Sequence, residues 1–234
     1  MTELTLDVPQ RSANQPHVAL ALVLDVSGSM NMNIPEVDRR RIDLLNDGLN
    51  TMIREMKDDN RLKNIVDVAI YTFGEPGMHN PYQGFHPIAD MEDIYLVANQ
   101  GSTYITGTLE MAVEHAKERS HQYNVAGGGA YKPWIVAITD GVFHDSDSEL
   151  NRVGTMMKQR EQEGKQHFFG MGICDDFVRG QLELFVNDKG RVQRINPSLL
   201  SEFFSWIGKS MKVISTKDPG AATTLPPFPT NILA

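Results

Sequence analysis

The stretch HVALALVLDVSGSM, residues 17–30, passes from an unbroken apolar run to oxygen-bearing side chains at Asp25, Ser27 and Ser29. Such a run is typical of a strand buried on both faces of a parallel sheet. Side chains two residues apart point the same way along an extended segment, and Gly28 permits a tight bend. The three oxygens can therefore converge on one point directly after a buried strand.

Apolar runs and amphipathic stretches alternate along the rest of the chain. The segment 84–89 contains Pro87 and follows a loop rich in Gly and Pro, which favours an antiparallel edge strand. The fold class is predicted to be α/β: a three-layer, doubly wound, mostly parallel central sheet with that one antiparallel edge strand and helices on both faces. The expected parallel strands are 17–24, 65–73, 133–139, 167–173 and 191–195, and apolar positions with helical spacing predict helices around 42–56, 109–116, 150–157 and 200–211.

Composition is that of an ordinary globular protein. Of the 234 residues, 41% are hydrophobic and 22% charged, and the mean hydropathy is -0.31. The longest apolar runs fall far short of the roughly 18 to 20 residues that a membrane span needs. We expect one domain at 17–213, with an extension at 1–16 and a Pro-rich tail at 214–234 that both lie on the surface or are disordered. GGGAYK at 127–132 is predicted to be a flexible loop before the central strand.

Charge and cysteine content limit the classes of partner. The 22 basic and 30 acidic residues give a net charge of -8, which offers no basic footprint for nucleic acid. The single cysteine, Cys174, cannot form an internal disulfide or a zinc knuckle. We expect a cytoplasmic protein with neither nucleic-acid nor membrane partners.

Two further segments place oxygen atoms after predicted strands or before helices. GSTYITGTLEMA at 101–112 carries Thr103 in a Gly-led loop, and AITDG at 137–141 carries Asp140 at a strand end. Ligands of open parallel sheets bind at the carboxyl ends of the strands, and Mg²⁺ takes few protein oxygens while keeping waters. Taken alone, Asp-x-Ser-x-Ser is explained equally well by capping of the next helix, but the two other segments favour a cation site.

Together these motifs resemble the von Willebrand factor A (VWA) domain family over roughly residues 17–212. DVSGS is similar to that family's Asp-x-Ser-x-Ser motif, and ITDG is similar to its final acid. The resemblance implies a metal-ion-dependent adhesion site that binds Mg²⁺, with Mn²⁺ or Ca²⁺ as alternatives, and through it an Asp or Glu of a partner protein. TYIT offers two hydroxyls, and the spacing to Leu109 favours Thr103 over Thr106. The implied metal ligands are Asp25, Ser27, Ser29, Thr103 and Asp140.

Within this family, the sequence most resembles the bacterial intracellular TerY-type group associated with tellurite resistance. The similarity lies in the segments HVALALVLDVSGSMNMNIPEVD, LNDGLNTMI, YITGTLEMAVEHAKE and YKPWIVAITDG. It implies a partner-binding module that works beside stress-response proteins, with a protein kinase, a phosphatase or Ter-type proteins as candidate partners. It leaves open which partner this chain binds.

Other acids follow the predicted strands, and a second class of function uses the same cation. HDSDSE at 144–149 reads mainly as the capped start of a helix, with contact to metal or partner as the alternative for Asp145 and Asp147. The same alternative is open for Asp175 and Asp176. A metal-dependent hydrolase or phosphoryl-transfer enzyme would need a base, for which His144 is the only candidate near the motif, so we expect a protein that is not an enzyme. A metal that only stabilises the fold is the third possibility.

Overall fold

The fold is described from a computed structural model, which covers residues 14–74, 84–99, 101–173 and 179–228. Six strands form one sheet in the order β5-β4-β1-β6-β7-β8, with every neighbouring pair parallel except β4 and β5. The predicted α/β class and its antiparallel edge strand are confirmed. The strands are β1 (Val18–Asp25), β4 (Val66–Phe73), β5 (His86–Pro87), β6 (Trp134–Thr139), β7 (His167–Gly172) and β8 (Val192–Arg194).

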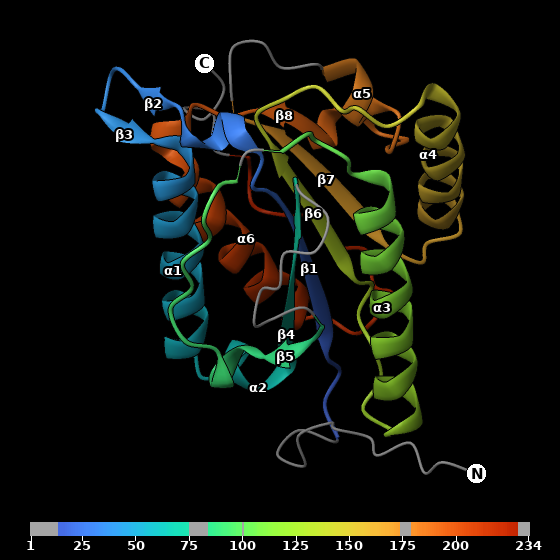
Figure 1. The fold of residues 1–234 in the computed structure, drawn as a ribbon. Coiled ribbons are helices and arrows are strands. Elements are labelled where there is room, and N and C mark those ends of the chain that lie inside the picture. Colours follow the sequence, from blue (N-terminus) through green and yellow to red (C-terminus); the bar gives the residue numbers. More distant parts are fainter. Residues whose placement is uncertain (1–13, 75–83, 100, 174–178, 229–234) are drawn as a thin grey trace, which may run out of the picture.

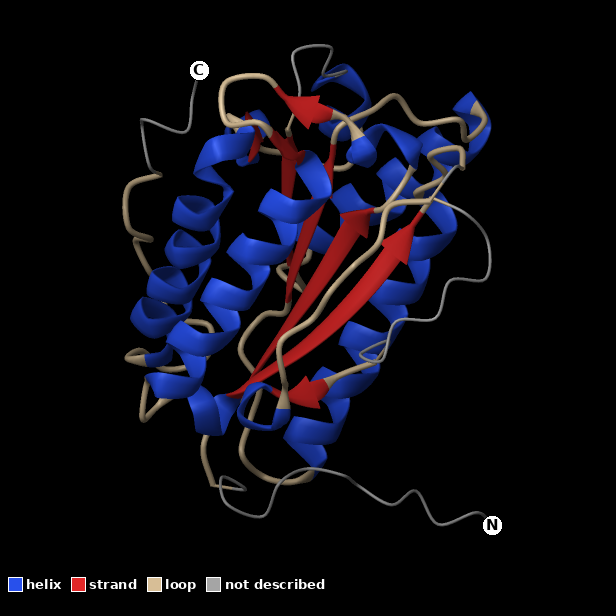
Figure 2. Cartoon of the chain, turned by 60° about the vertical axis from the view of Figure 1, so that its left-hand side comes forward, coloured by secondary structure: helices blue, strands red, loops and turns tan. Residues whose placement is uncertain are grey.

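Helices cover both faces of this sheet, as Figures 1 and 2 show from two sides. On one face lie α1 (Arg41–Asp58), α2 (Leu62–Ile65) and α6 (Leu200–Ser215), and on the other α3 (Thr106–Val125), α4 (Asp147–Gln162) and α5 (Arg179–Glu183). None of the described helices is both long and apolar enough to cross a membrane.

The apolar run of β1 is buried on both sides because it feeds two separate cores. Leu20, Leu22 and Leu24 pack with α1 and α6, whereas Ala21 and Val23 pack with the α3 and α4 side. The small residues on the second side leave room for the close approach of α3. Burial on two faces explains why the run shows no polar alternation.

A two-stranded hairpin stands outside the sheet and was not predicted. Its strands, β2 (Asn33–Ile34) and β3 (Arg39–Arg40), pair antiparallel directly before α1. Two residues are too few to show a periodicity of two, so no sequence pattern marks this hairpin. It matters for the site because it sets where α1 begins.

Two segments without helix or strand are held against the domain by hydrogen bonds and ring contacts. The stretch 127–132, predicted to be a flexible loop, pairs with the residue before β1: Tyr131 N donates to the His17 carbonyl (2.8 Å) and His17 N donates to the Gly129 carbonyl (3.1 Å). The part of the tail up to residue 228 folds back on α6, where the Phe228 and Trp206 rings lie 4.8 Å apart. The domain boundaries at 16/17 and 213/214 stay a prediction, and α6 runs two residues past the second.

Side chains of α1 hold an extended segment that leads to the site. Asn46 exchanges two hydrogen bonds with the backbone of Leu96 (2.9 and 2.8 Å), and Asn50 exchanges two with Ile94 (2.9 and 2.7 Å). The two asparagines lie four residues apart and therefore on one face of the helix. The Asn46 and Asn50 side chains thus form the backbone hydrogen bonds that a neighbouring strand would otherwise provide.

Candidate metal centre

The site lies at the carboxyl ends of β1 and β6, the two central strands of the sheet. Asp25 is the last residue of β1, and Asp140 directly follows β6. Ser29 lies in the short 3₁₀ helix Gly28–Asn31 that bends away from β1, and Thr103 lies in the loop before α3. The chain runs from β1 to β4 on one side and later from β6 to β7 on the other, so this edge is where the strand order reverses.

Both carboxylate oxygens of Asp25 are held in place. The Ser27 amide donates to Asp25 Oδ1 (2.8 Å), and the Thr139 hydroxyl donates to Asp25 Oδ2 (2.6 Å). The Asp25 side chain is therefore fixed from its own turn and from the neighbouring strand. Thr139 is a positioning residue that sequence reasoning missed, although it stands next to Asp140 in the quoted AITDG segment.

The other predicted ligands join the same cluster. The hydroxyls of Ser27 and Ser29 lie 3.1 Å apart, and the Ser29 hydroxyl donates to Asp140 Oδ1 (2.5 Å). A methyl group built on Gly141 would meet Thr103 Oγ1 at 3.7 Å and Ser29 Oγ at 3.8 Å, which puts these two hydroxyls around the same glycine. The structure thus brings all five predicted side chains together.

The chemistry of this cluster fits a divalent cation. Asp25 is fully buried, and burial raises the pKa of its carboxyl from 3.8 to about 6, against the hydrogen bonds from Thr139 and Ser27, while the nearby charge of Asp140 raises it further. Two carboxylates in a buried site are costly without a compensating positive charge. The donors are all hydroxyl or carboxylate oxygens, the set that hard cations prefer.

Gly74 lets the turn after β1 approach the end of β4. Its φ of +148° lies in a region that side chains disfavour, and a β-carbon there would lie 3.0 Å from the Ser27 amide nitrogen. The Val26 amide also donates to the Phe73 carbonyl (2.8 Å). Any larger residue at position 74 would push the Ser27 turn away from the sheet.

Asp145 does not lie among the five clustered side chains. Its carboxylate accepts hydrogen bonds from the amides of Ile105 (2.9 Å) and Thr106 (3.0 Å), at the start of α3, and from the Thr106 hydroxyl. Because the Thr106 hydroxyl donates to Asp145, it does not point into the cluster. The hydroxyl beside Ser29 is that of Thr103. Asp145 acts as a cap for α3, contributed from a distant segment.

The segment after Asp145 is the capped helix start that its sequence indicated. Ser146 and Glu149 form a reciprocal capping box at α4, and Asp147 lies in the first turn of that helix. His144 accepts a hydrogen bond at Nδ1 from the Thr103 amide (3.1 Å), so it supports the Thr103 loop. Cys174, Asp175 and Asp176 lie outside the described residues.

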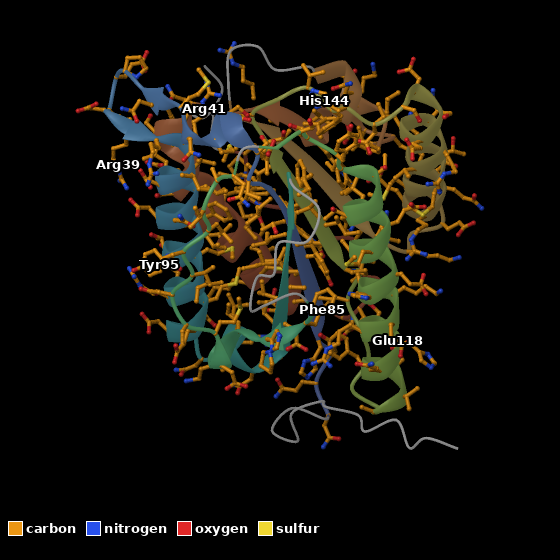
Figure 3. All side chains as sticks on the ribbon, in the orientation of Figure 1. Arg39, Arg41, Phe85, Tyr95, Glu118 and His144 are labelled. Atoms are coloured by element: carbon orange, nitrogen blue, oxygen red, sulfur yellow. The ribbon has the colours of Figure 1, made fainter. Side chains whose placement is uncertain are left out.

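Arg41 is a cation in the site that no sequence motif indicated. Arg41 Nη1 donates to Asp140 Oδ2 at 2.7 Å, and the Asp140 side chain is fully buried. Figure 3 shows Arg41 and His144 at the end of the molecule where the site lies. The ion pair joins residues 99 apart in sequence, and Arg41 directly follows the second strand of the hairpin.

No protein-family model and no curated protein matches the sequence, but solved structures share its fold. Proximal thread matrix protein 1 (PTMP1) from the mussel byssus, with a zinc-occupied MIDAS motif, is 17% identical over 83% of this chain and 48% of that chain, with a TM-score of 0.51. The SpRpn10 VWA domain is 15% identical over 80% of this chain and 93% of that domain, with a TM-score of 0.53. The vWF domain of the type V pili tip protein Mfa5 from Porphyromonas gingivalis is 13% identical over 89% and 99%, with a TM-score of 0.58.

These neighbours define the architecture as that of von Willebrand factor A domains. The chain spans about half the length of PTMP1, at 48% of that chain, and nearly all of the two isolated domains. PTMP1 holds zinc at a MIDAS motif, so the fold accommodates a metal at such a site.

Proposed function

We propose that this protein is a metal-dependent protein-binding module. Asp25, Ser27, Ser29, Thr103 and Asp140 would hold Mg²⁺, and the loaded site would bind an Asp or Glu side chain of a partner protein. The observation that carries the proposal is the convergence of these five side chains, two of them carboxylates, at the carboxyl edge of the sheet. When bound, the ion supplies a Lewis-acidic position that a carboxylate from outside can fill.

The surface around the cluster supports a protein partner. Met32, Tyr104 and Val142 are all exposed, with 56%, 52% and 48% of their surface accessible, and each lies within three residues of a proposed ligand. Exposed apolar side chains beside a polar centre are a common feature of protein interfaces. A partner acid at the metal would bring its own neighbours onto these three side chains.

An enzyme using the same ion is the less favoured candidate. A general base needs a free acceptor nitrogen, and His144 uses Nδ1 to accept from the Thr103 amide, which leaves its other nitrogen as the proton carrier in the neutral ring. The hydroxyls of Ser27 and Ser29 contact each other, and the Ser29 hydroxyl donates to Asp140; among the described residues, neither hydroxyl has a hydrogen bond to a histidine. This arrangement favours binding over turnover.

The partner system is a further part of the proposal. The resemblance to the TerY-type group supports a cytoplasmic stress-response setting of the tellurite-resistance kind, with a kinase, a phosphatase or Ter-type proteins as candidate partners. Affinity purification from the host would be run with Mg²⁺ and with chelator, using the wild type and Ser29→Ala. A partner retained by the wild type in Mg²⁺, and lost in the two other conditions, would support this setting.

Calorimetry tests the metal site itself. Titration of Mg²⁺ should show one site in the wild type and a loss of at least about tenfold in affinity for Ser29→Ala and Asp140→Asn. Ser148→Ala is the matched control, because Ser148 is exposed and its hydroxyl has a hydrogen bond only with Ser146 within the described residues. Unchanged Mg²⁺ binding in Ser29→Ala and Asp140→Asn would refute the assignment, and a metal-induced rise in melting temperature without carboxylate binding would favour a purely structural ion.

A further inference from the structure

Arg41 is held at the site by two hydrogen bonds, one from its side chain and one from its backbone amide. Its guanidinium donates to Asp140 Oδ2 (2.7 Å), while the other oxygen of Asp140 accepts from the Ser29 hydroxyl. Its backbone amide donates to the carbonyl of Met32 (3.1 Å), which ties the start of α1 to the end of the Ser29 turn. Since β2 and β3 pair between these two points, the hairpin fixes how far the guanidinium reaches.

The guanidinium is also largely enclosed. The Arg41 side chain is only 19% exposed, and its Nε atom is buried with no hydrogen-bond partner among the described residues. A buried arginine donor of this kind retains capacity for a further acceptor. Arg41 also lines a 260 Å³ groove next to the site, together with Ile34 and Ile173.

The charges of the cluster have a simple sum. Asp25 and Asp140 contribute two negative charges and Arg41 one positive charge, which leaves -1 before a cation binds and +1 with a divalent ion in place. Without Arg41 the loaded site would be neutral. A guanidinium on Asp140 therefore weakens the hold on the metal and strengthens the attraction for an anion.

We propose that Arg41 is a built-in counter-charge that lowers the affinity of this site for the metal and raises the affinity of the loaded site for a carboxylate. This inference rests on the proposed function, because it assumes that the five-residue cluster binds a divalent ion. Arg41 affects the metal through Asp140, and it is a positioning residue for the Asp140 carboxylate. The Arg41 side chain also lines the groove, where its positive charge attracts an incoming carboxylate.

The test measures two affinities that should move in opposite directions. Mg²⁺ is titrated calorimetrically into the wild type and Arg41→Gln, and N-acetyl-aspartyl amide is then titrated into the Mn²⁺-loaded proteins, followed by water proton relaxation. Arg41→Gln should bind Mg²⁺ about tenfold more tightly and the aspartyl probe about tenfold more weakly, from the loss of one nearby charge. Arg41→Lys keeps the charge and should bind Mg²⁺ within about threefold of the wild type.

Several results would overturn the inference. If Arg41→Gln weakens both affinities, Arg41 only supports the fold of the site, and if it changes neither, its charge has no effect. If Arg41→Lys tightens Mg²⁺ binding as strongly as Arg41→Gln, the charge is not the cause. Arg39→Gln is the matched control, since Arg39 pairs with Asp47 on the exposed surface. A wild type that binds no Mg²⁺ would instead refute the proposed function.

Discussion

At the scale of single residues, the ionisation of Asp25 makes the stability of the protein depend on pH. Its carboxyl is fully buried, and its pKa is raised from 3.8 to about 6, mainly by loss of solvent. A raised carboxyl pKa means that the folded state holds the proton more tightly than the unfolded chain does. In the absence of metal, this contribution to stability is fully present below pH 3.8 and is lost as the pH rises through about 6.

We predict that Mg²⁺ reverses this pH dependence. The ion binds only the ionised carboxylate, so its affinity should fall about tenfold for each pH unit below the pKa of Asp25. Urea unfolding between pH 4.5 and 7.5, with chelator and with saturating Mg²⁺, measures both slopes. Asp25→Asn removes the titrating group and serves as the control. If this variant keeps the slope of the wild type, another group is responsible.

We predict that Gly74→Ala damages the metal site. The new methyl group would lie 3.0 Å from the Ser27 amide nitrogen at a φ of +148°, so the turn must shift. We expect a loss of about 1 to 3 kcal/mol in the free energy of unfolding and weaker Mg²⁺ binding. Gly84→Ala is the control, because Gly84 also has a positive φ (+112°), but a β-carbon added there would meet no atom of the described residues within 4 Å beyond its chain neighbours. Equal Mg²⁺ affinities in the two variants would contradict this explanation.

At the scale of elements, α1 does more than bury an apolar stripe. Asn46 and Asn50 are 7% and 5% exposed, and each pairs with both backbone groups of one residue in the extended segment 91–99. That segment has no strand of its own to pair with. It continues to Asn99, whose amide donates to the Val26 carbonyl (2.8 Å) in the turn that carries the site.

We predict that Asn50→Ala destabilises the protein by about 2 to 3 kcal/mol, because it leaves a buried amide and carbonyl of Ile94 unpaired. Urea unfolding monitored by circular dichroism measures this change. Asn151→Ala on the exposed face of α4 is the matched control, and alanine there should be neutral or slightly stabilising. A cost below about 0.5 kcal/mol at Asn50 would show that solvent replaces both hydrogen bonds.

At the scale of the whole molecule, the C-terminal segment closes one side of the α6 layer. The Trp206 indole donates to the Pro226 carbonyl (3.1 Å), and the Tyr131 hydroxyl donates to the Lys217 carbonyl (2.7 Å). The Phe228 ring packs in tilted contact with the rings of both Phe203 and Trp206. Phe228 is partly buried and packs against the core on the α1 and α6 side, and these contacts involve none of the five clustered residues.

We predict that Phe228→Ala lowers the free energy of unfolding by about 1 to 2 kcal/mol, less than for a fully buried phenylalanine, and leaves Mg²⁺ affinity unchanged. Thermal unfolding and calorimetry measure the two quantities. Thr224→Ala, at an exposed position of the same segment, is the control. A change in metal affinity in Phe228→Ala alone would mean that the tail and the site are coupled.

The sequence predicted the sheet because its strands are long apolar runs and its main helices have clear apolar spacing. It did not predict β2, β3, α2 or α5, since elements of two to five residues carry too little periodicity, whereas the equally short β5 was predicted from Pro87 and the loop before it. It predicted a loop at 127–132, where the structure has no helix or strand, but it could not predict the pairing of that segment with His17, which joins residues more than 100 positions apart.

By itself, the sequence determined the α/β architecture and named five candidate oxygen ligands, because both depend on local patterns: buried runs, the polar residues at their ends, and a Gly-led loop before a helix. Only the tertiary structure shows that Thr106 donates a hydrogen bond to Asp145 and that Thr139 donates one to Asp25. The same is true of the ion pair between Arg41 and Asp140. Each of these is a contact between segments remote in sequence. Its geometry depends on how the strands and the hairpin pack, which no local pattern records.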